Sequence, residues 1–274
     1  MTDHVDHLER RLTEACRGDG TLIVAFSGGV DSALLAVAAA RARPGRVVAA
    51  TARSASLASG ELDHCRGFAD EWQIPWRAVD TRELDDERYL VNDSSRCFWC
   101  KSALMDALDP LSDELDATVV LGVNVDDLGD HRPGQDAAAQ RGARFPFVDA
   151  GFGKADVRAL ARAWGLDVWD RPAMPCLASR IPYHTPVSVN LLSRVDRAEA
   201  GVRALGFDDV RVRHYDTTAR VEIPRDDFAR CVDRAEEIVA AVAAAGYDYV
   251  TLDLAGLRSG NLNRALTASE RSGS

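Results

Sequence analysis

Short apolar runs alternate with longer helical patterns from residue 3 to about residue 165. Four of the runs are predicted to be buried strands: 21–27, 46–52, 76–81 and 118–124. Three segments between them are predicted to be helices: 31–43, 59–72 and 101–115. Pro110 lies inside the last of these and would break it. Strands that alternate with helices predict an α/β fold with a doubly wound parallel sheet, which binds ligands at the carboxyl ends of its strands.

The pattern changes after an amphipathic helix predicted over 153–166. Segment 170–188 holds four of the ten prolines and is predicted to be a domain boundary. Further elements follow it: a helix at 189–205, two strands joined by a turn at 209–215 and 219–224, a helix at 226–245 and a strand at 249–256. The sequence therefore predicts an α/β domain over 1–170, a smaller α+β domain over 171–266 and a disordered polar tail over 267–274.

Composition narrows the class of protein. The 274 residues are 46% hydrophobic, enough for full cores, and the net charge of -10 argues against a nucleic acid as main partner. The longest apolar runs, Ala33–Ala40 and Ile238–Ala245, fall short of the roughly 20 residues that span a membrane. The polar first residues lack the pattern of a secretory signal. We therefore expect a cytoplasmic protein with no membrane partner.

The six cysteines are expected to stay reduced in the cytoplasm. Cys16, Cys65 and Cys231 stand alone in helical stretches and are predicted to be packing residues. The other three are Cys97 and Cys100, in the string RCFWCK, and Cys176. The CxxC spacing by itself fits a redox pair, half of a zinc site or part of an iron-sulfur site.

The string SGGVDS follows the first predicted strand and opens the first helix. Gly28 and Gly29 allow a tight turn and close approach of the backbone to a ligand, and helix amides can bind an anion. Ser27 and Ser32 add hydroxyl donors. Asp31 would hold Mg²⁺ or cap the helix, and we favour the metal. A Walker A loop is excluded because its lysine is missing.

This string resembles the phosphate loop of the N-type ATP pyrophosphatases. The resemblance implies binding of ATP and Mg²⁺, cleavage of ATP to pyrophosphate, and activation of a substrate oxygen as an adenylate. Five strings together resemble the LarE-type sulfur transferases of nickel-pincer nucleotide biosynthesis: 96–101, 122–134, 174–188, 211–223 and 253–263. This wider resemblance covers the chain from the phosphate loop to about residue 266.

The resemblance implies adenylation of the carboxylates of pyridinium-3,5-biscarboxylic acid mononucleotide, followed by replacement of oxygen with sulfur. Sulfur reaches the substrate in this family by two routes. In one, a cysteine at the position of Cys176 gives up its own sulfur. In the other, three cysteines bind a 4Fe-4S cluster that carries exchangeable sulfide. Cys97, Cys100 and Cys176 match the second pattern, and Arg96 and Lys101 would offset the charge of the cluster.

Several alternatives stay open at this point. Cys97, Cys100, Cys176 and His184 could bind zinc, either in an enzyme or in a non-catalytic scaffold. The CxxC pair could be redox active, or Cys176 could be a sacrificial donor with the pair as bystander. A tRNA thiolation enzyme would share the adenylation chemistry, although the acidic net charge argues against tRNA as the substrate.

Further site residues follow from the resemblance. Arg211, Arg213 and Arg258 are expected near the substrate phosphate, and Arg220 lies on the paired strand, although spacing alone fits a solvated face. Ser179, Arg180 and Glu199 are expected to orient the adenylate and the sulfur donor. Asp126 and Asp127, with Asp130, follow a predicted buried strand at the carboxyl edge of the sheet, and for this reason they are expected to bind Mg²⁺ or to position the ribose, although charge alone fits a solvated turn. The resemblance also implies a homo-oligomer, a hexamer, and leaves the sulfide donor unidentified.

Overall fold

The computed structural model describes residues 2–129, 133–172 and 174–258. Contacts between Cα atoms divide them into two compact units. Unit 1 comprises the described residues within Met1–Ser54, Gly60–Glu83 and Cys97–Met174. Unit 2 comprises those within Ala55–Ser59, Leu84–Arg96 and Pro175–Ser274. The predicted division after residue 170 stays a prediction. The contacts also group two short segments of the N-terminal half, Ala55–Ser59 and Leu84–Arg96, with the C-terminal part of the chain.

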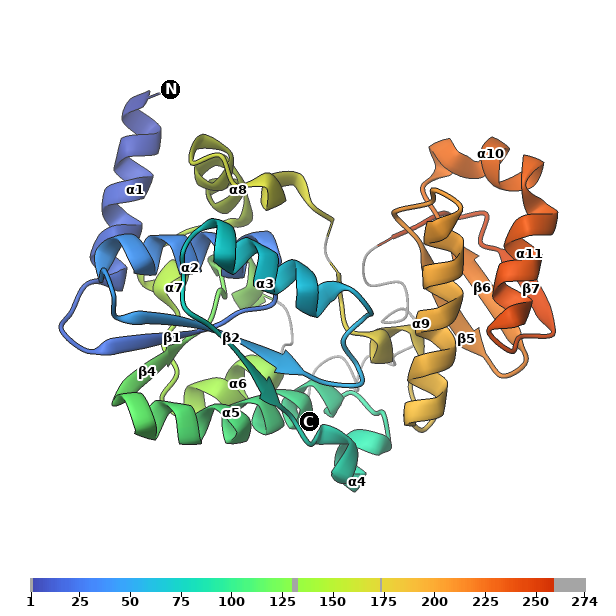
Figure 1. The fold of residues 1–274 in the computed structure, drawn as a ribbon, viewed down its shortest axis with the longest axis horizontal. Helices are drawn as coiled ribbons and strands as arrows, with labels where there is room; N and C mark the ends of the chain where they lie inside the picture. The colour runs from blue at the N-terminus through green and yellow to red at the C-terminus, as the bar shows by residue number, and fades with distance from the viewer. Residues whose placement is uncertain (1, 130–132, 173, 259–274) are drawn as a thin grey trace. The chain divides into compact units, whose positions relative to one another are not determined.

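Unit 1 is built on a four-stranded parallel sheet with strand order β3-β2-β1-β4. Its strands are β1 (Thr21–Ala25), β2 (Val47–Arg53), β3 (Trp76–Asp80) and β4 (Ala117–Val120). Helices α2 (Val30–Ala42), α3 (Glu61–Glu71) and α5 (Arg96–Leu115) follow β1, β2 and β3 in the chain and lie on both sides of the sheet (Figure 1). This arrangement confirms the predicted doubly wound α/β fold.

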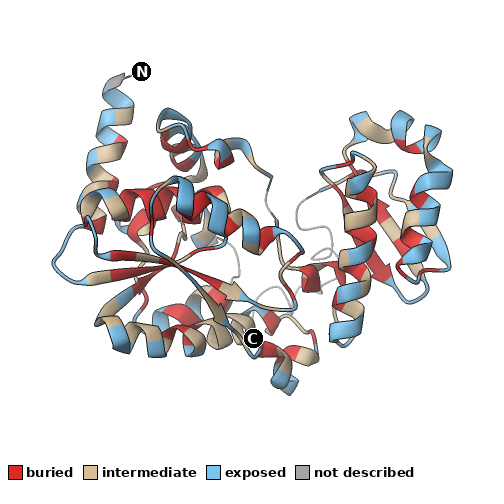
Figure 2. Ribbon diagram, viewed as in Figure 1, coloured by how far each residue is buried: buried red, intermediate tan, exposed pale blue. Residues whose placement is uncertain are grey.

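Alternation along the central strand explains why both faces are covered. Leu22 and Val24 of β1 belong to one buried cluster, together with α2, α1 (Thr2–Cys16) and α8 (Lys154–Ala163). Ile23 points to the other face, where it packs in a cluster with Met105 and Leu108 of α5. Figure 2 shows the resulting burial, which is densest along α2 and the strands. Unit 1 also contains the short helices α6 (Pro133–Gln140) and α7 (Pro146–Asp149), whereas the short helix α4 (Glu87–Leu90) belongs to unit 2.

The predicted break at Pro110 is wrong, because α5 continues through it. Pro110 is exposed, and so is Asp106, the residue whose carbonyl would have accepted the missing N–H. Water can therefore hydrate that carbonyl, while Met105 and Leu108 anchor the opposite side of the helix in the core.

Unit 2 holds a three-stranded sheet with order β5-β6-β7. Strands β5 (Arg211–Tyr215) and β6 (Thr218–Glu222) form the predicted hairpin, and β7 (Tyr249–Leu252) runs parallel to β6. Helices α9 (Val189–Ala204), α10 (Phe228–Asp233) and α11 (Ala235–Ala244) complete this unit.

The single helix predicted over 226–245 is wrong, because the chain breaks between α10 and α11 at Arg234. Arg234 leaves the helical conformation, with φ -110° and ψ 24°. Its guanidinium donates to the carbonyl of Leu205 at 2.5 Å and to Glu237. No helix within the described residues is both long and apolar enough to span a bilayer.

Candidate functional site

The phosphate loop lies between β1 and α2, at the carboxyl edge of the parallel sheet. The backbone N–H of Ser27 donates to Ser32 Oγ at 3.1 Å, and Ser32 Oγ donates to the carbonyl of Gly29 at 3.0 Å. Gly29 is the N-cap of the 13-residue helix α2 and provides no side-chain acceptor for its first amides. Hydrogen bonds of Ser27 and Ser32 thus stabilise the loop, and the helix N-terminus that follows it is suited to bind an anion.

Asp31 lies in the first turn of α2 and does not cap the helix. Its Oδ1 accepts from Asn124 Nδ2 at 3.2 Å, and its Oδ2 accepts from the ammonium group of Lys154. The Asp31 side chain keeps 26% of its surface exposed. A carboxylate paired with a mobile ammonium group can exchange that partner for Mg²⁺, which prefers oxygen ligands.

Sequence reasoning missed Asn124 and Lys154 as site residues. Asn124 lies four residues after the end of β4, in one of the strings that carry the family resemblance, and Lys154 is the first residue of α8. A polar residue after a buried strand was an available signal for Asn124, since ligands bind at that edge of the sheet. Nothing in the sequence places Lys154 beside Asp31, since this contact depends on how α8 packs.

Asp126 and Asp127 hold backbone amides. Asp126 Oδ2 accepts from the N–H of Lys154 at 2.7 Å, and Asp127 Oδ2 accepts from the N–H of Asn124 at 3.1 Å. The two carboxylates therefore fix the turn after β4 and the start of α8, next to the Asp31 pair. Asp130 lies outside the described residues.

Cys97 and Cys100 lie three apart in the first turn of α5, so their side chains share one face of the helix. Cys97 is exposed and Cys100 is partly buried. Gly134 of α6 packs tightly on this turn, because a Cβ there would lie 2.9 Å from the carbonyl oxygen of Cys97. By contrast, Cys16, Cys65 and Cys231 are buried, which confirms that they are packing residues.

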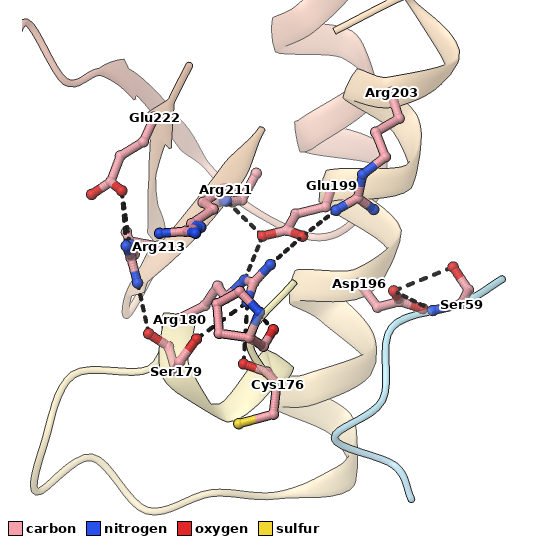
Figure 3. A network of polar contacts seen from close by, with 12 residues as sticks. Ser59, Cys176, Ser179, Arg180, Asp196, Glu199, Arg203, Arg211, Arg213 and Glu222 are labelled. Atoms are coloured by element: carbon pink, nitrogen blue, oxygen red, sulfur yellow. Dashed lines mark hydrogen bonds and ion pairs between the residues drawn. The ribbon is translucent and has the colours of Figure 1, made fainter. Parts of the chain in front are cut away.

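Cys176 is the N-cap of a 3₁₀ turn, Leu177–Arg180, in unit 2, and its thiol is partly exposed. Figure 3 shows the polar contacts that support this turn. The Arg180 guanidinium donates through Nη1 to the carbonyls of Pro175 and Cys176, the latter at 3.2 Å, and to Ser179 Oγ at 3.2 Å. Arg180 thus holds the peptide bonds on both sides of Cys176.

A buried carboxylate holds Arg180 in turn. Arg180 Nε and Nη2 donate to the two oxygens of Glu199 at 2.8 and 3.1 Å, and these side chains are 1% and 0% exposed. Glu199 also accepts from Arg203 at 2.7 Å and from the N–H of Val212 at 3.0 Å. Arg180 and Glu199 are therefore in a position to orient Cys176 through its backbone (Figure 3).

A second buried network lies on β5 and β6. Arg213 donates to Glu222 through Nε and Nη2 at 3.0 and 2.9 Å, and through Nη1 to the carbonyl of Ser179 at 2.7 Å. Arg220 contacts the other oxygen of Glu222 at 3.2 Å. Arg213 is 3% exposed. These contacts place Arg213 inside unit 2 and tie its sheet to the turn that carries Cys176.

Arg211 lies on the same face of β5, two residues before Arg213. Its Nη1 donates to the backbone carbonyl of Arg258 at 3.2 Å, which brings these two sequence-predicted residues together. Burial, together with the positive charges of Arg180 and Arg213, lowers the pKa of the Arg211 guanidinium. A bound anion would offset this accumulation of positive charge.

The expected metal ligands come from both units, since Cys97 and Cys100 belong to unit 1 and Cys176 to unit 2. Within residues 2–129, 133–172 and 174–258, no three His, Cys, Asp or Glu side chains are gathered as a metal site. The three-cysteine set, and the zinc set that adds His184, stay predictions.

Comparison with known proteins gives consistent matches. The family model for asparagine synthase matches residues 5–95. An uncharacterized protein of Synechocystis is 43% identical over 248 residues, covering 89% of this chain and 92% of the relative. The pyridinium-3,5-bisthiocarboxylic acid mononucleotide synthase of Lactiplantibacillus plantarum is 34% identical over 252 residues, covering 90% of each chain. A glutamine-hydrolyzing GMP synthase component from Thermoplasma acidophilum is 25% identical over 213 residues, covering 72% of this chain and 68% of the relative.

The phosphate loop and the parallel sheet agree with the first of these matches, and the second and third span both units. The chain belongs to the ATP pyrophosphatases that share this phosphate loop and, among them, to the family of pyridinium-3,5-bisthiocarboxylic acid mononucleotide synthase, the LarE family.

Proposed function

We propose that this protein is an ATP-dependent sulfur transferase that converts the carboxylates of pyridinium-3,5-biscarboxylic acid mononucleotide to thiocarboxylates. The 34% identity to the synthase of Lactiplantibacillus plantarum over 90% of the chain is the observation that carries this proposal. In the first step, a substrate carboxylate oxygen attacks the α-phosphorus of ATP and pyrophosphate leaves. In the second step, sulfur adds to the acyl carbon, and AMP leaves with the original oxygen.

The residues of unit 1 fit the first step. The amides at the start of α2 and the hydroxyls of Ser27 and Ser32 would bind the phosphates, and Asp31 would hold Mg²⁺ in place of Lys154. Asp126 and Asp127 would support this site through the backbone of α8 and of the turn after β4. Lys154 would then be free to neutralise the leaving pyrophosphate.

The residues of unit 2 fit substrate binding and sulfur transfer. Arg211 would bind the phosphate of the nucleotide, because a phosphate dianion offsets the positive charge gathered around this side chain. Arg213 would support that site through Glu222, and Arg258 would close it. Ser179, Arg180 and Glu199 would fix the backbone at Cys176, so that its thiol keeps one direction as a ligand of the sulfur-carrying group.

We further propose that Cys97, Cys100 and Cys176 bind a 4Fe-4S cluster. The donor set fits this group, because these are the three thiols that are not buried. In addition, Arg96, which directly precedes Cys97, donates to the carbonyl of Ala178 at 2.9 Å, two residues beyond Cys176. When bound, the cluster would supply the sulfur atom that replaces the carboxylate oxygen.

Metal analysis after anaerobic purification tests the cluster. We expect a brown protein with about four irons and matching sulfide, and loss of both in Cys176→Ala. Cys231→Ala is the matched control, since this buried cysteine of unit 2 should leave the iron content unchanged. Stoichiometric zinc in a colourless protein would support the scaffold instead. A metal-free protein that loses the mass of H₂S from Cys176 during one turnover would establish the sacrificial route.

Pyrophosphate release tests the reaction. We expect release that depends on the biscarboxylate mononucleotide, and its loss in Asp31→Ala with the iron content unchanged. Tight binding of tRNA at low salt, with release that depends on tRNA, would refute the proposed substrate. Light scattering tests the homo-hexamer that the family resemblance implies.

A further inference from the structure

The peptide bond between Gly28 and Gly29 is held from outside the phosphate loop. The carbonyl oxygen of Gly28 lies 3.2 Å from His64 Nε2 and 3.4 Å from Arg171 Nη1. A carbonyl oxygen only accepts, so Nε2 of His64 carries the proton in this contact. Two side chains from outside the loop therefore fix the direction of a single carbonyl.

Gly28 has no room for a side chain at this point. Its φ of +71° lies in the left-handed region, and a Cβ would lie 2.9 Å from both Cys65 Sγ and His64 Cδ2. Helix α3 thus packs directly against the loop backbone, which keeps His64 within reach of the carbonyl. Arg171 approaches the same oxygen from the segment after the 3₁₀ turn Asp167–Asp170.

Arg171 is itself held in place. Its Nη2 donates to Glu61 Oε1 at 2.7 Å, and the two side chains are 24% and 10% exposed. Glu61 is the first residue of α3, so the same helix positions both donors to Gly28. The contact lies wholly within unit 1.

The direction of the Gly28 carbonyl sets the direction of the next amide. The described chain has no cis peptide bond, and in a trans peptide the C=O and N–H point to opposite sides. A carbonyl turned toward His64 and Arg171 therefore turns the N–H of Gly29 the other way. Gly29 is the N-cap of α2, where amide groups bind anions.

We propose that Arg171 is a positioning residue for ATP cleavage, which holds the Gly28–Gly29 peptide so that the Gly29 amide faces the phosphates. The inference rests on the proposed adenylating function. In this role Arg171 acts through the backbone of the phosphate loop. When Arg171 is replaced, His64 alone holds the Gly28 carbonyl, so loss of the charged donor weakens the hold on a peptide whose glycines have no side chains of their own to restrain it.

Nucleotide binding tests this role directly. The affinity of the wild-type protein for the ATP analogue α,β-methylene-ATP, with Mg²⁺, is compared with that of Arg171→Gln, Arg171→Lys and Arg158→Gln. We expect about tenfold weaker binding for Arg171→Gln, comparable to the loss of one charge-assisted hydrogen bond, and partial recovery for Arg171→Lys. Arg158 is an exposed arginine of α8 in the same unit, so Arg158→Gln controls for the change in net charge.

Kinetics separate positioning from a merely structural role. In the pyrophosphate assay we expect Arg171→Gln to raise KM for ATP about tenfold and to leave KM for the biscarboxylate substrate unchanged. A lower melting temperature with unchanged analogue affinity would overturn the inference and leave the proposed function intact. Failure of the wild-type protein to bind the analogue would overturn both.

Discussion

Glu199→Gln is a substitution for which the structure predicts a large loss of stability. Glu199 is fully buried and accepts four hydrogen bonds, two from Arg180 and one each from Arg203 and the N–H of Val212. Each carboxylate oxygen accepts two of these, so the amide nitrogen of glutamine would face two donors wherever it lies. The buried Arg180 guanidinium would also lose its counter-charge.

Removing one partner of a buried ion pair costs about 3–5 kcal/mol, and we expect this loss for unit 2. Tryptophan fluorescence would miss it, because all five tryptophans belong to unit 1. Hydrogen exchange measured by mass spectrometry in peptides from α9 and β5 reports the opening free energy of this unit. Glu237→Gln is the matched control, since Glu237 forms an exposed pair with Arg234 and its removal should leave exchange unchanged.

The same hydrogen-exchange measurement on Arg180→Gln and on the double variant Glu199→Gln/Arg180→Gln completes a double-mutant cycle. We expect the double variant to lose less stability than the sum of the single variants, because removing both charges leaves no buried charge unpaired. A loss below about 1 kcal/mol for Glu199→Gln, or strict additivity, would refute the view that this pair supports the Cys176 turn.

Three further results are expected. At pH 8 a thiol reagent should label only Cys97, Cys100 and Cys176 in metal-free native protein. Burial raises the pKa of Cys16 to about 12 and that of Cys65 to about 11, so these thiols should stay unreactive. Quick labelling of either would contradict the predicted packing. Burial, aided by the positive charge of Arg194, lowers the pKa of His214 below its ordinary value of 6.5. The stability that the neutral form of His214 contributes is therefore fully present above pH 6.5 and is lost as the pH falls through the lowered pKa. Urea unfolding followed by circular dichroism from pH 7.5 to 5.5 should show this slope reduced in His214→Gln but not in the exposed control His7→Gln, and equal slopes would remove His214 as its cause. Finally, Gly122→Ala should weaken nucleotide binding several-fold, because its Cβ would lie 3.0 Å from the backbone of Asp31 and Ser32, whereas Gly67→Ala meets no atom within 4 Å and controls for substitution of a glycine alone.

The sequence predicted those parts of the fold that local pattern determines. Apolar runs bounded by turn residues located all four strands of unit 1, and the signal is most continuous in β1, where three successive residues are buried on both faces of the sheet. Pro110 shows the limit of such reasoning. Whether a proline breaks a helix depends on whether the side of the helix it occupies faces water, and this is decided by packing against residues distant in the sequence.

The candidate site was predictable to a similar extent. The string at 27–32 predicts an anion-binding loop from its glycines and its place between strand and helix, and the structure places it between β1 and α2. The partner of Asp31 was not predictable, since Lys154 reaches it only through tertiary packing. Arg213 shows the converse: a pattern of alternating arginines does not reveal that Glu222, nine residues later and on the next strand, takes up its charge.

The order in which unit 2 is synthesised follows from its discontinuous make-up. The chain passes between the units after residues 54, 59, 83, 96 and 174. Asn92, which is fully buried, donates to the carbonyls of Pro182 and Thr185, so its partners leave the ribosome about 90 residues later, after several seconds of synthesis. During that interval the segment Leu84–Arg96 lacks its contacts with the C-terminal part of unit 2, although strands β1 to β3 of unit 1 have already been synthesised. A nascent chain stalled before residue 182 should therefore expose this segment to proteases and chaperones.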